Sequence, residues 1–64
     1  MKINPLISVC MATFNGEAYV LQQIKSILNN LNPSDEIIIV DDFSNDKTVE
    51  IISNLKDKRI KIFV

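Results

Sequence analysis

The sequence predicts an α/β fold in which parallel strands alternate with helices, a βαβαβ unit. Three runs rich in β-branched residues occur at Leu6–Met11, Ile37–Val40 and Arg59–Val64, which favours strands. Between them lie segments whose apolar residues recur every three or four positions, as in amphipathic helices. Since parallel strands need a crossover connection, this order predicts a parallel sheet joined by right-handed crossovers.

The first strand follows a polar lead-in and covers Leu6–Met11, and it contains Cys10, the only cysteine. A single cysteine has no intrachain disulfide partner, so we expect a buried free thiol. The stretch Ala12–Gly16 contains the only glycine, where we expect a tight turn.

The first helix is predicted from Glu17 to about Leu31, with Asn15 as N-cap and Glu17 in the first turn. Its apolar stripe consists of Val20, Leu21, Ile24, Ile27, Leu28 and Leu31. We expect the aromatic rings of Tyr19 and Phe63 to pack in the core or on its rim.

The central strand Ile37–Val40 has β-branched residues in succession and is therefore expected to be covered on both faces. Asp41 and Asp42 follow it directly. In parallel α/β sheets the carboxyl ends of the strands are where ligands bind. The acidic pair is thus a candidate site.

The second helix is predicted to run from the cap-forming stretch Phe43–Asp46 to about Leu55. A charged, solvated turn, Lys56–Arg59, leads into the last strand. Because the sequence stops inside that predicted strand, we expect residues 1–64 to be the N-terminal part of one larger, incomplete domain.

Composition excludes several classes of function. With a net charge of −1 over 64 residues, nucleic acid is not expected as the main partner. The absence of histidine and the single cysteine exclude zinc sites and Ser-His or Cys-His catalysis within the chain. One glycine cannot form a dinucleotide or Walker loop. The single unpaired cysteine fits a reducing cytoplasm, which is the expected location, and the N-terminal apolar run is too weak for a signal peptide.

The acidic pair has three possible roles: metal ligand, hydrogen-bond acceptor for a nucleoside, or cap of the next helix. Adjacent side chains point in opposite directions in an extended backbone, so one carboxylate can hold the loop while the other faces the crevice. A calcium loop starting at Asp42 fails, because Lys47 and Ser53 replace the required Gly and Glu. Phe14 offers a flat face for a base, or is simply a core residue.

Three blocks in order, Ile7–Glu17, Ser26–Leu28 and Ile38–Thr48, resemble the opening of family 2 glycosyltransferases. These are inverting enzymes of the GT-A fold, a Rossmann-like α/β sandwich. The resemblance implies that the chain is the N-terminal nucleotide-binding half of such a fold. It also implies that these residues bind the nucleotide: Ala12, Thr13, Phe14, Glu17, Asp41 and Asp42.

The resemblance assigns a role to each position. Phe14 stacks on the base, Asp42 accepts from a ring N–H, and Ala12 and Thr13 approach the nucleoside with backbone and hydroxyl. Uracil or thymine is favoured over cytosine, which lacks that proton, and guanine remains open. The family commonly has Pro or Thr at position 12 and Tyr at position 14, so this chain loses a hydroxyl contact there and keeps the stacking face.

The same resemblance implies a UDP- or dTDP-sugar donor, a glycan or lipid-linked acceptor, and bacterial surface polysaccharide synthesis, with a peripheral inner-membrane location as one option. A divalent cation, Mg²⁺ or Mn²⁺, is expected in the intact protein. Its ligands and the catalytic base lie outside this chain, so no catalytic residue is assigned here and residues 1–64 alone are expected to be inactive.

Two alternatives remain. A phosphorelay receiver also has an acidic pair before a helix, but after its first strand rather than its second. An inert fragment that self-associates through unpaired strand edges is the other.

Overall fold

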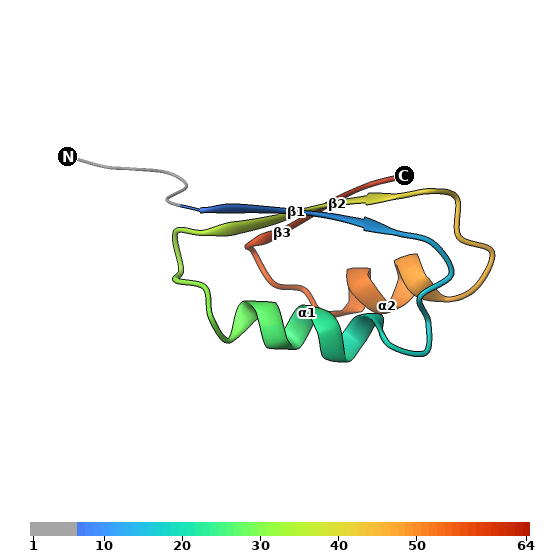
Figure 1. The fold of residues 1–64 in the computed structure, drawn as a ribbon, viewed down its shortest axis with the longest axis horizontal. Coiled ribbons are helices and arrows are strands. Elements are labelled where there is room, and N and C mark those ends of the chain that lie inside the picture. The colour runs from blue at the N-terminus through green and yellow to red at the C-terminus, as the bar shows by residue number, and fades with distance from the viewer. Residues whose placement is uncertain (1–6) are drawn as a thin grey trace.

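The computed structural model describes residues 7–64, which form a three-stranded sheet and two helices (Figure 1). The elements are β1 (Ser8–Thr13), α1 (Val20–Leu28), β2 (Glu36–Asp41), α2 (Thr48–Asn54) and β3 (Ile60–Phe63). All strand pairs are parallel and β2 lies in the centre, in the order β1-β2-β3. The predicted βαβαβ order is confirmed, while Leu6, expected in the first strand, lies outside the described residues.

The register of the sheet aligns the ends of its strands. Ser8 lies opposite Glu36 and Thr13 lies opposite Asp41, so β1 and β2 start and stop together. The segments that follow Thr13 and Asp41 therefore leave the sheet at the same edge, which we call the carboxyl edge.

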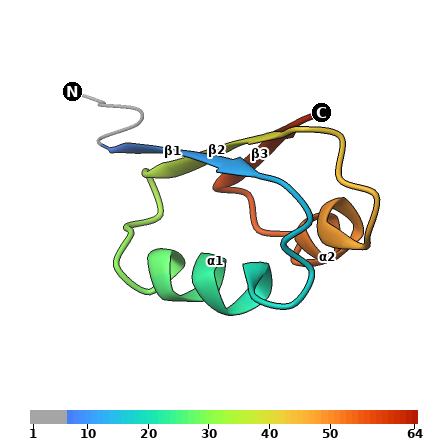
Figure 2. The same cartoon turned by 45° about the vertical axis from the view of Figure 1, so that its right-hand side comes forward.

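The hydrophobic core lies between the sheet and the helices, which are both on the same face (Figure 2). Alternate residues of β2 point into it, and α1 and α2 each add residues spaced for one helical face. The core residues, each at most 1% exposed, are Val20, Ile24, Ile37, Ile39 and Ile52. Neither described helix is long and apolar enough to cross a membrane.

The opposite face of the sheet is open within residues 7–64, so the expectation of a strand covered on both faces is wrong for this part of the protein. Ile38 is half-buried and Val40 is 54% exposed. Cys10 lies on the same face and is exposed, which corrects the expectation of a buried thiol. The cause is the two-residue period of a strand, which turns these side chains away from the helices.

The first helix begins at Val20 rather than Glu17, and Asn15 is not its cap. Asn15 instead takes a positive φ of 48° and forms hydrogen bonds with the segment after β2. Glu17 likewise lies outside the helix, in a turn. Side-chain partners from the neighbouring loop compete with helix capping here and determine where α1 starts.

Aromatic residues expected in the core or on its rim are largely exposed: Tyr19 by 54% and Phe63 by 57%. The Tyr19 ring lies over Gly16, where an added Cβ would come within 3.1 Å of it. The chain turns at Gly16 as expected, since the Gly16 carbonyl accepts from the Tyr19 N–H at 3.0 Å. The positive φ in this stretch is on Asn15 and not on Gly16.

Candidate functional site

Two loops meet at the carboxyl edge of the sheet. The first, residues 14–19, joins β1 to α1, and the second, residues 42–47, joins β2 to α2. They lie side by side in Figures 1 and 2. All six sequence-predicted nucleotide-binding residues lie on these loops or on the last strand residues before them.

Asp41 anchors the second loop from inside the protein. Its side chain is 2% exposed and accepts hydrogen bonds from the Thr13 hydroxyl at 2.7 Å and from the Ser44 hydroxyl at 2.6 Å. The Ser44 backbone N–H donates to the other carboxylate oxygen at 2.8 Å. Asp41 is thus the member of the acidic pair that holds the loop.

The hydrogen bond from the Ser44 hydroxyl lowers the pKa of Asp41 below its ordinary value, although burial acts in the opposite direction. The Ser44 N–H and the Thr13 hydroxyl add to this lowering. Both carboxylate oxygens are satisfied by donors, so the ionised form is the stable one and binds the loop tightly.

A parallel alignment of the chains continues past the ends of β1 and β2. The Asp42 N–H donates to the Thr13 carbonyl at 2.9 Å, and the Asn15 N–H donates to the Ser44 hydroxyl at 2.8 Å. In return, the Asn45 N–H donates to the Asn15 side-chain oxygen at 2.8 Å. The two loops are therefore joined residue by residue, close to the strand ends.

A second group of hydrogen bonds joins the loops nearer the helices. The Gly16 N–H donates to the Thr48 hydroxyl at 2.7 Å, and the Glu17 N–H donates to the Asp46 carboxylate at 3.1 Å. The Glu17 carboxylate accepts from the Lys47 N–H at 2.9 Å. The Thr48 hydroxyl donates to Asp46 and lowers the pKa of that carboxyl. We call both groups together the cross-loop brace.

The cross-loop brace leaves part of the predicted site facing outward. Phe14 is 55% exposed, and Asp42 is exposed with no partner for its carboxylate among residues 7–64. Ala12, also exposed, lies at the end of β1 on the open face. A stacking surface and a free acceptor are thus available on adjacent loops.

The other predicted site residues are engaged inside the protein. Thr13 is 5% exposed and gives its hydroxyl to Asp41, while Glu17 is exposed but accepts from the Lys47 N–H. The structure brings all six residues to one edge and divides them into Ala12, Phe14 and Asp42, which are exposed and free, and Thr13, Glu17 and Asp41, which hold the loops.

These residues do not form a metal site. Residues 7–64 contain no group of three or more acidic, histidine or cysteine side chains placed to hold an ion. Asp41, the buried carboxylate of the pair, has both oxygens occupied by O–H and N–H donors. Asp42 alone does not meet the ligand number that a divalent cation requires.

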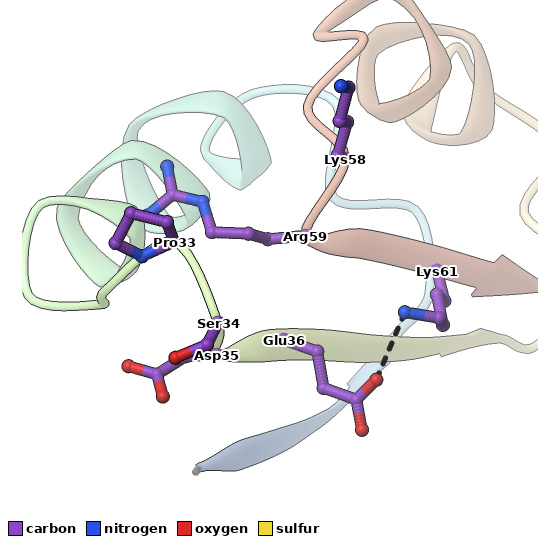
Figure 3. A pocket seen from close by; sticks show the side chains of 7 residues that line it. All are labelled: Pro33, Ser34, Asp35, Glu36, Lys58, Arg59 and Lys61. Atoms are coloured by element: carbon purple, nitrogen blue, oxygen red, sulfur yellow. Dashed lines mark ion pairs between the residues drawn. The ribbon is translucent and has the colours of Figure 1, made fainter. Parts of the chain in front are cut away.

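A hollow of about 220 Å³ lies at the other end of the sheet, the amino edge (Figure 3). It is lined by Pro33, Ser34, Asp35, Glu36, Lys58, Arg59 and Lys61. Lys61 pairs with Glu36 at 3.1 Å, and Figure 3 shows Lys58 pointing away from that pair.

Arg59 is the central residue of this edge. Its guanidinium pairs with Asp57 at 2.9 Å and donates to the carbonyls of Leu28 and Leu31, at 3.2 and 3.1 Å. It therefore satisfies carbonyl groups at and just after the end of α1, which corrects the expectation of a solvated turn for Arg59. Lys56 and Lys58 are exposed, as expected. The charges here hold the fold together.

Four residues of the cross-loop brace were missed as site residues: Asn15, Ser44, Asp46 and Thr48. All four are polar residues that often form turns and helix caps, and this is the only property in the sequence that could have indicated their role. Their partners on the other loop lie about 30 positions away in the chain, at separations of 29 to 32 residues. No local pattern reveals such pairs.

The fold and the edge define an α/β unit of the Rossmann-like class, with its free polar groups at the carboxyl ends of parallel strands. Residues 8–64 match the family described as Glycosyl transferase family 2. The chain belongs to this family, and its βαβαβ unit corresponds to the N-terminal part of the GT-A fold. This membership also sets aside the receiver-domain alternative.

Bacterial relatives support the same assignment. An uncharacterized glycosyltransferase of Haemophilus influenzae is 49% identical over 61 residues, covering 92% of this chain and 24% of the relative. A GalNAc(5)-diNAcBac-PP-undecaprenol beta-1,3-glucosyltransferase of Campylobacter jejuni is 42% identical, covering 94% of this chain and 20% of the relative.

A UDP-Glc:alpha-D-GlcNAc-diphosphoundecaprenol beta-1,3-glucosyltransferase of Escherichia coli is 38% identical over 55 residues, covering 86% of this chain and 22% of the relative. The chain thus spans between a fifth and a quarter of the length of these relatives.

Proposed function

We propose that residues 1–64 form the N-terminal part of one GT-A domain and bind the nucleotide of a sugar donor, UDP- or dTDP-sugar, in an inverting glycosyltransferase. The observation that carries the proposal is the pairing of an exposed ring, Phe14, with a free carboxylate, Asp42, on two braced loops at the carboxyl edge. A ring supplies a stacking surface and a carboxylate accepts from a base N–H.

Each of the six residues has a part in this proposal. Phe14 stacks on the base, Asp42 accepts from its ring N–H, and Ala12 lets the backbone approach the nucleoside. Thr13, Asp41 and Glu17 act by holding the loops, since their polar groups are already engaged. Preorganised contacts of this kind avoid the cost of ordering the loops when the ligand binds.

The rest of the reaction is assigned to sequence outside this chain. A divalent cation, Mg²⁺ or Mn²⁺, would need ligands other than residues 7–64, which hold no metal cluster. The catalytic base is placed there too. Residues 1–64 alone should therefore show no sugar transfer, and turnover of a nucleotide sugar by this purified chain would contradict that statement.

The acceptor class follows from the named relatives. Relatives in Campylobacter jejuni and Escherichia coli carry undecaprenol-linked acceptors in their names. We propose a glycan or lipid-linked acceptor, surface polysaccharide synthesis, and a cytoplasmic location at the inner membrane face for the intact protein.

The test is calorimetric titration of the full-length protein with uridine diphosphate and thymidine diphosphate. Asp42→Ala removes the acceptor and should weaken binding by about ten-fold or more, the value of a hydrogen bond to a charged group. Glu50→Ala, an exposed carboxylate on α2, is the matched control and should leave the affinity unchanged. Equal losses in the two variants would refute the role of Asp42.

A further inference from the structure

Phe43 combines two unusual properties at the carboxyl edge. Its φ is +53°, a left-handed conformation that is strained for a residue with a bulky side chain. It is also 73% exposed, more than any other large hydrophobic residue of the described chain. The protein thus accepts a strained backbone to present an aromatic ring that does not pack in the core.

The pairing of Thr13 with Asp41 sets Asp42 opposite Phe14, and Phe43 is the next residue on the second loop. Asp42 and Thr13, the residues just before the two phenylalanines, share a backbone hydrogen bond of 2.9 Å. The backbone N–H of Asn15, just after Phe14, donates to the side-chain hydroxyl of Ser44, just after Phe43, at 2.8 Å. The two phenylalanines therefore lie on neighbouring loops, offset by one position. Asp42, with its free carboxylate, lies opposite Phe14 and next to Phe43 in the chain.

We infer that Phe43 is a second aromatic contact for the nucleobase of the donor, acting together with Phe14. This inference rests on the proposed function and adds to it a residue that determines base binding. An aromatic face takes up any base by stacking, whereas the Asp42 carboxylate selects for a ring N–H. Affinity and selectivity would then come from different residues of one pocket.

Because the backbone at Phe43 is strained, one substitution in the full-length protein should raise its stability and lower its affinity for the nucleotide. Phe43→Gly removes the strain, so the melting temperature should rise by about 1 to 3 °C. The same substitution removes a stacking surface, so affinity for uridine diphosphate should fall by about five-fold or more. Phe43→Tyr keeps both the ring and the strain and should match the parent protein in both measurements.

Lys56→Gly is the matched control for the backbone effect. Lys56 also has a positive φ, of 52°, and lies after α2, away from the carboxyl edge. This variant should gain melting temperature without losing affinity. Uridine monophosphate should show the same fold loss with Phe43→Gly as uridine diphosphate does, since the two ligands share the base.

The possible outcomes separate the inference from the proposal beneath it. If Phe14→Ala and Asp42→Ala weaken binding while Phe43→Gly does not, the pocket is correct and the role of Phe43 is wrong. A fall in melting temperature with Phe43→Gly means that the ring packs inside the longer protein, which also overturns the inference. A loss confined to uridine diphosphate would place Phe43 at the phosphates instead. If none of the three variants changes affinity, both the inference and the proposed function fail.

Discussion

The two edges of the sheet use polar side chains for different purposes. At the amino edge the charged groups other than Lys58 pair with each other or with backbone. Arg59 joins the start of β3 to the end of α1, and Asp35 accepts from the N–H groups of Ile7 and Asn32. At the carboxyl edge the polar groups also brace the backbone, but Phe14, Asp42 and Phe43 remain exposed. The contrast suggests that the polar groups of the amino edge stabilise the fold and that the exposed groups of the carboxyl edge are available to bind a ligand.

The largest effect is expected for Asp41→Ala at the carboxyl edge. The substitution leaves the Thr13 hydroxyl and the Ser44 N–H without their buried acceptor, which should cost about 2 to 4 kcal/mol of the free energy of unfolding. Binding should weaken as well, because the second loop loses its anchor. Urea unfolding and nucleotide titration of the full-length protein measure the two effects, and an unchanged affinity would show that the brace does not support the pocket.

Arg59→Met at the amino edge tests the other half of the comparison. It removes the donors to Leu28 and Leu31 while keeping an apolar stem, and should cost about 1 to 3 kcal/mol of stability. Nucleotide affinity, measured at a temperature where the variant is folded, should not change. A loss of affinity similar to that of Asp42→Ala would mean that the two edges are not separate in function.

The pH dependence of stability should report on both edges. Hydrogen bonds from Ser44 lower the pKa of Asp41 below 3.8, and those from Arg59 do the same for Asp57. A carboxyl group with a lowered pKa in the folded state stabilises the fold above its unfolded pKa, and this contribution is lost as the pH falls through the folded pKa. The melting temperature should therefore drop below about pH 4.

Two variants test which carboxyl groups cause this fall in melting temperature at low pH. Asp41→Asn and Asp57→Asn should each make the melting temperature less dependent on pH between about pH 3 and 5. In both variants the melting temperature near neutral pH should be lower than in the parent. An unchanged acid slope in Asp41→Asn would show that this carboxyl has a similar pKa in the folded and unfolded states.

The smallest effect is expected for Asn15→Gly. Glycine accepts the positive φ, so the change removes only the side-chain oxygen that accepts from the Asn45 N–H, at a cost of about 1 kcal/mol. Asn15→Ala adds the cost of the positive φ and should be less stable than Asn15→Gly. Thermal unfolding of the two variants measures the difference, and equal stability would show that the backbone at this position is not strained.

The element order and the parallel sheet were predictable, because the two-residue and 3.6-residue periods of the apolar residues are local properties of the sequence. The position of the acidic pair was predictable for the same reason. The one-sided coverage of β2 was not, because a run such as Ile37–Val40 looks the same whether one face or both are buried. Asn15 was assigned to the wrong role because its partners, Ser44 and Asn45, come from a loop 29 to 30 positions away.

The strain at Phe43 could not be predicted either, since Phe43 lies inside a turn that Ser44 closes by hydrogen bonds to the buried Asp41, and that burial depends on the folded chain. The sequence predicted that one carboxylate of the acidic pair holds the loop and the other faces the crevice, but not which one does which. Burial and hydrogen bonding identify Asp41 as the anchor, and the assignment of Asp42 to the nucleobase stays a prediction.

The exposed position of Cys10 makes the open face of the sheet accessible to thiol chemistry. Cys10 is the single cysteine of residues 1–64 and lies beside Ile38 and Val40. Its rate of alkylation in the purified 64-residue chain, compared with the rate in the full-length protein, would report directly whether other parts of the protein cover this face. The residue thus serves as an internal chemical label, without any engineered mutation in this part of the sequence.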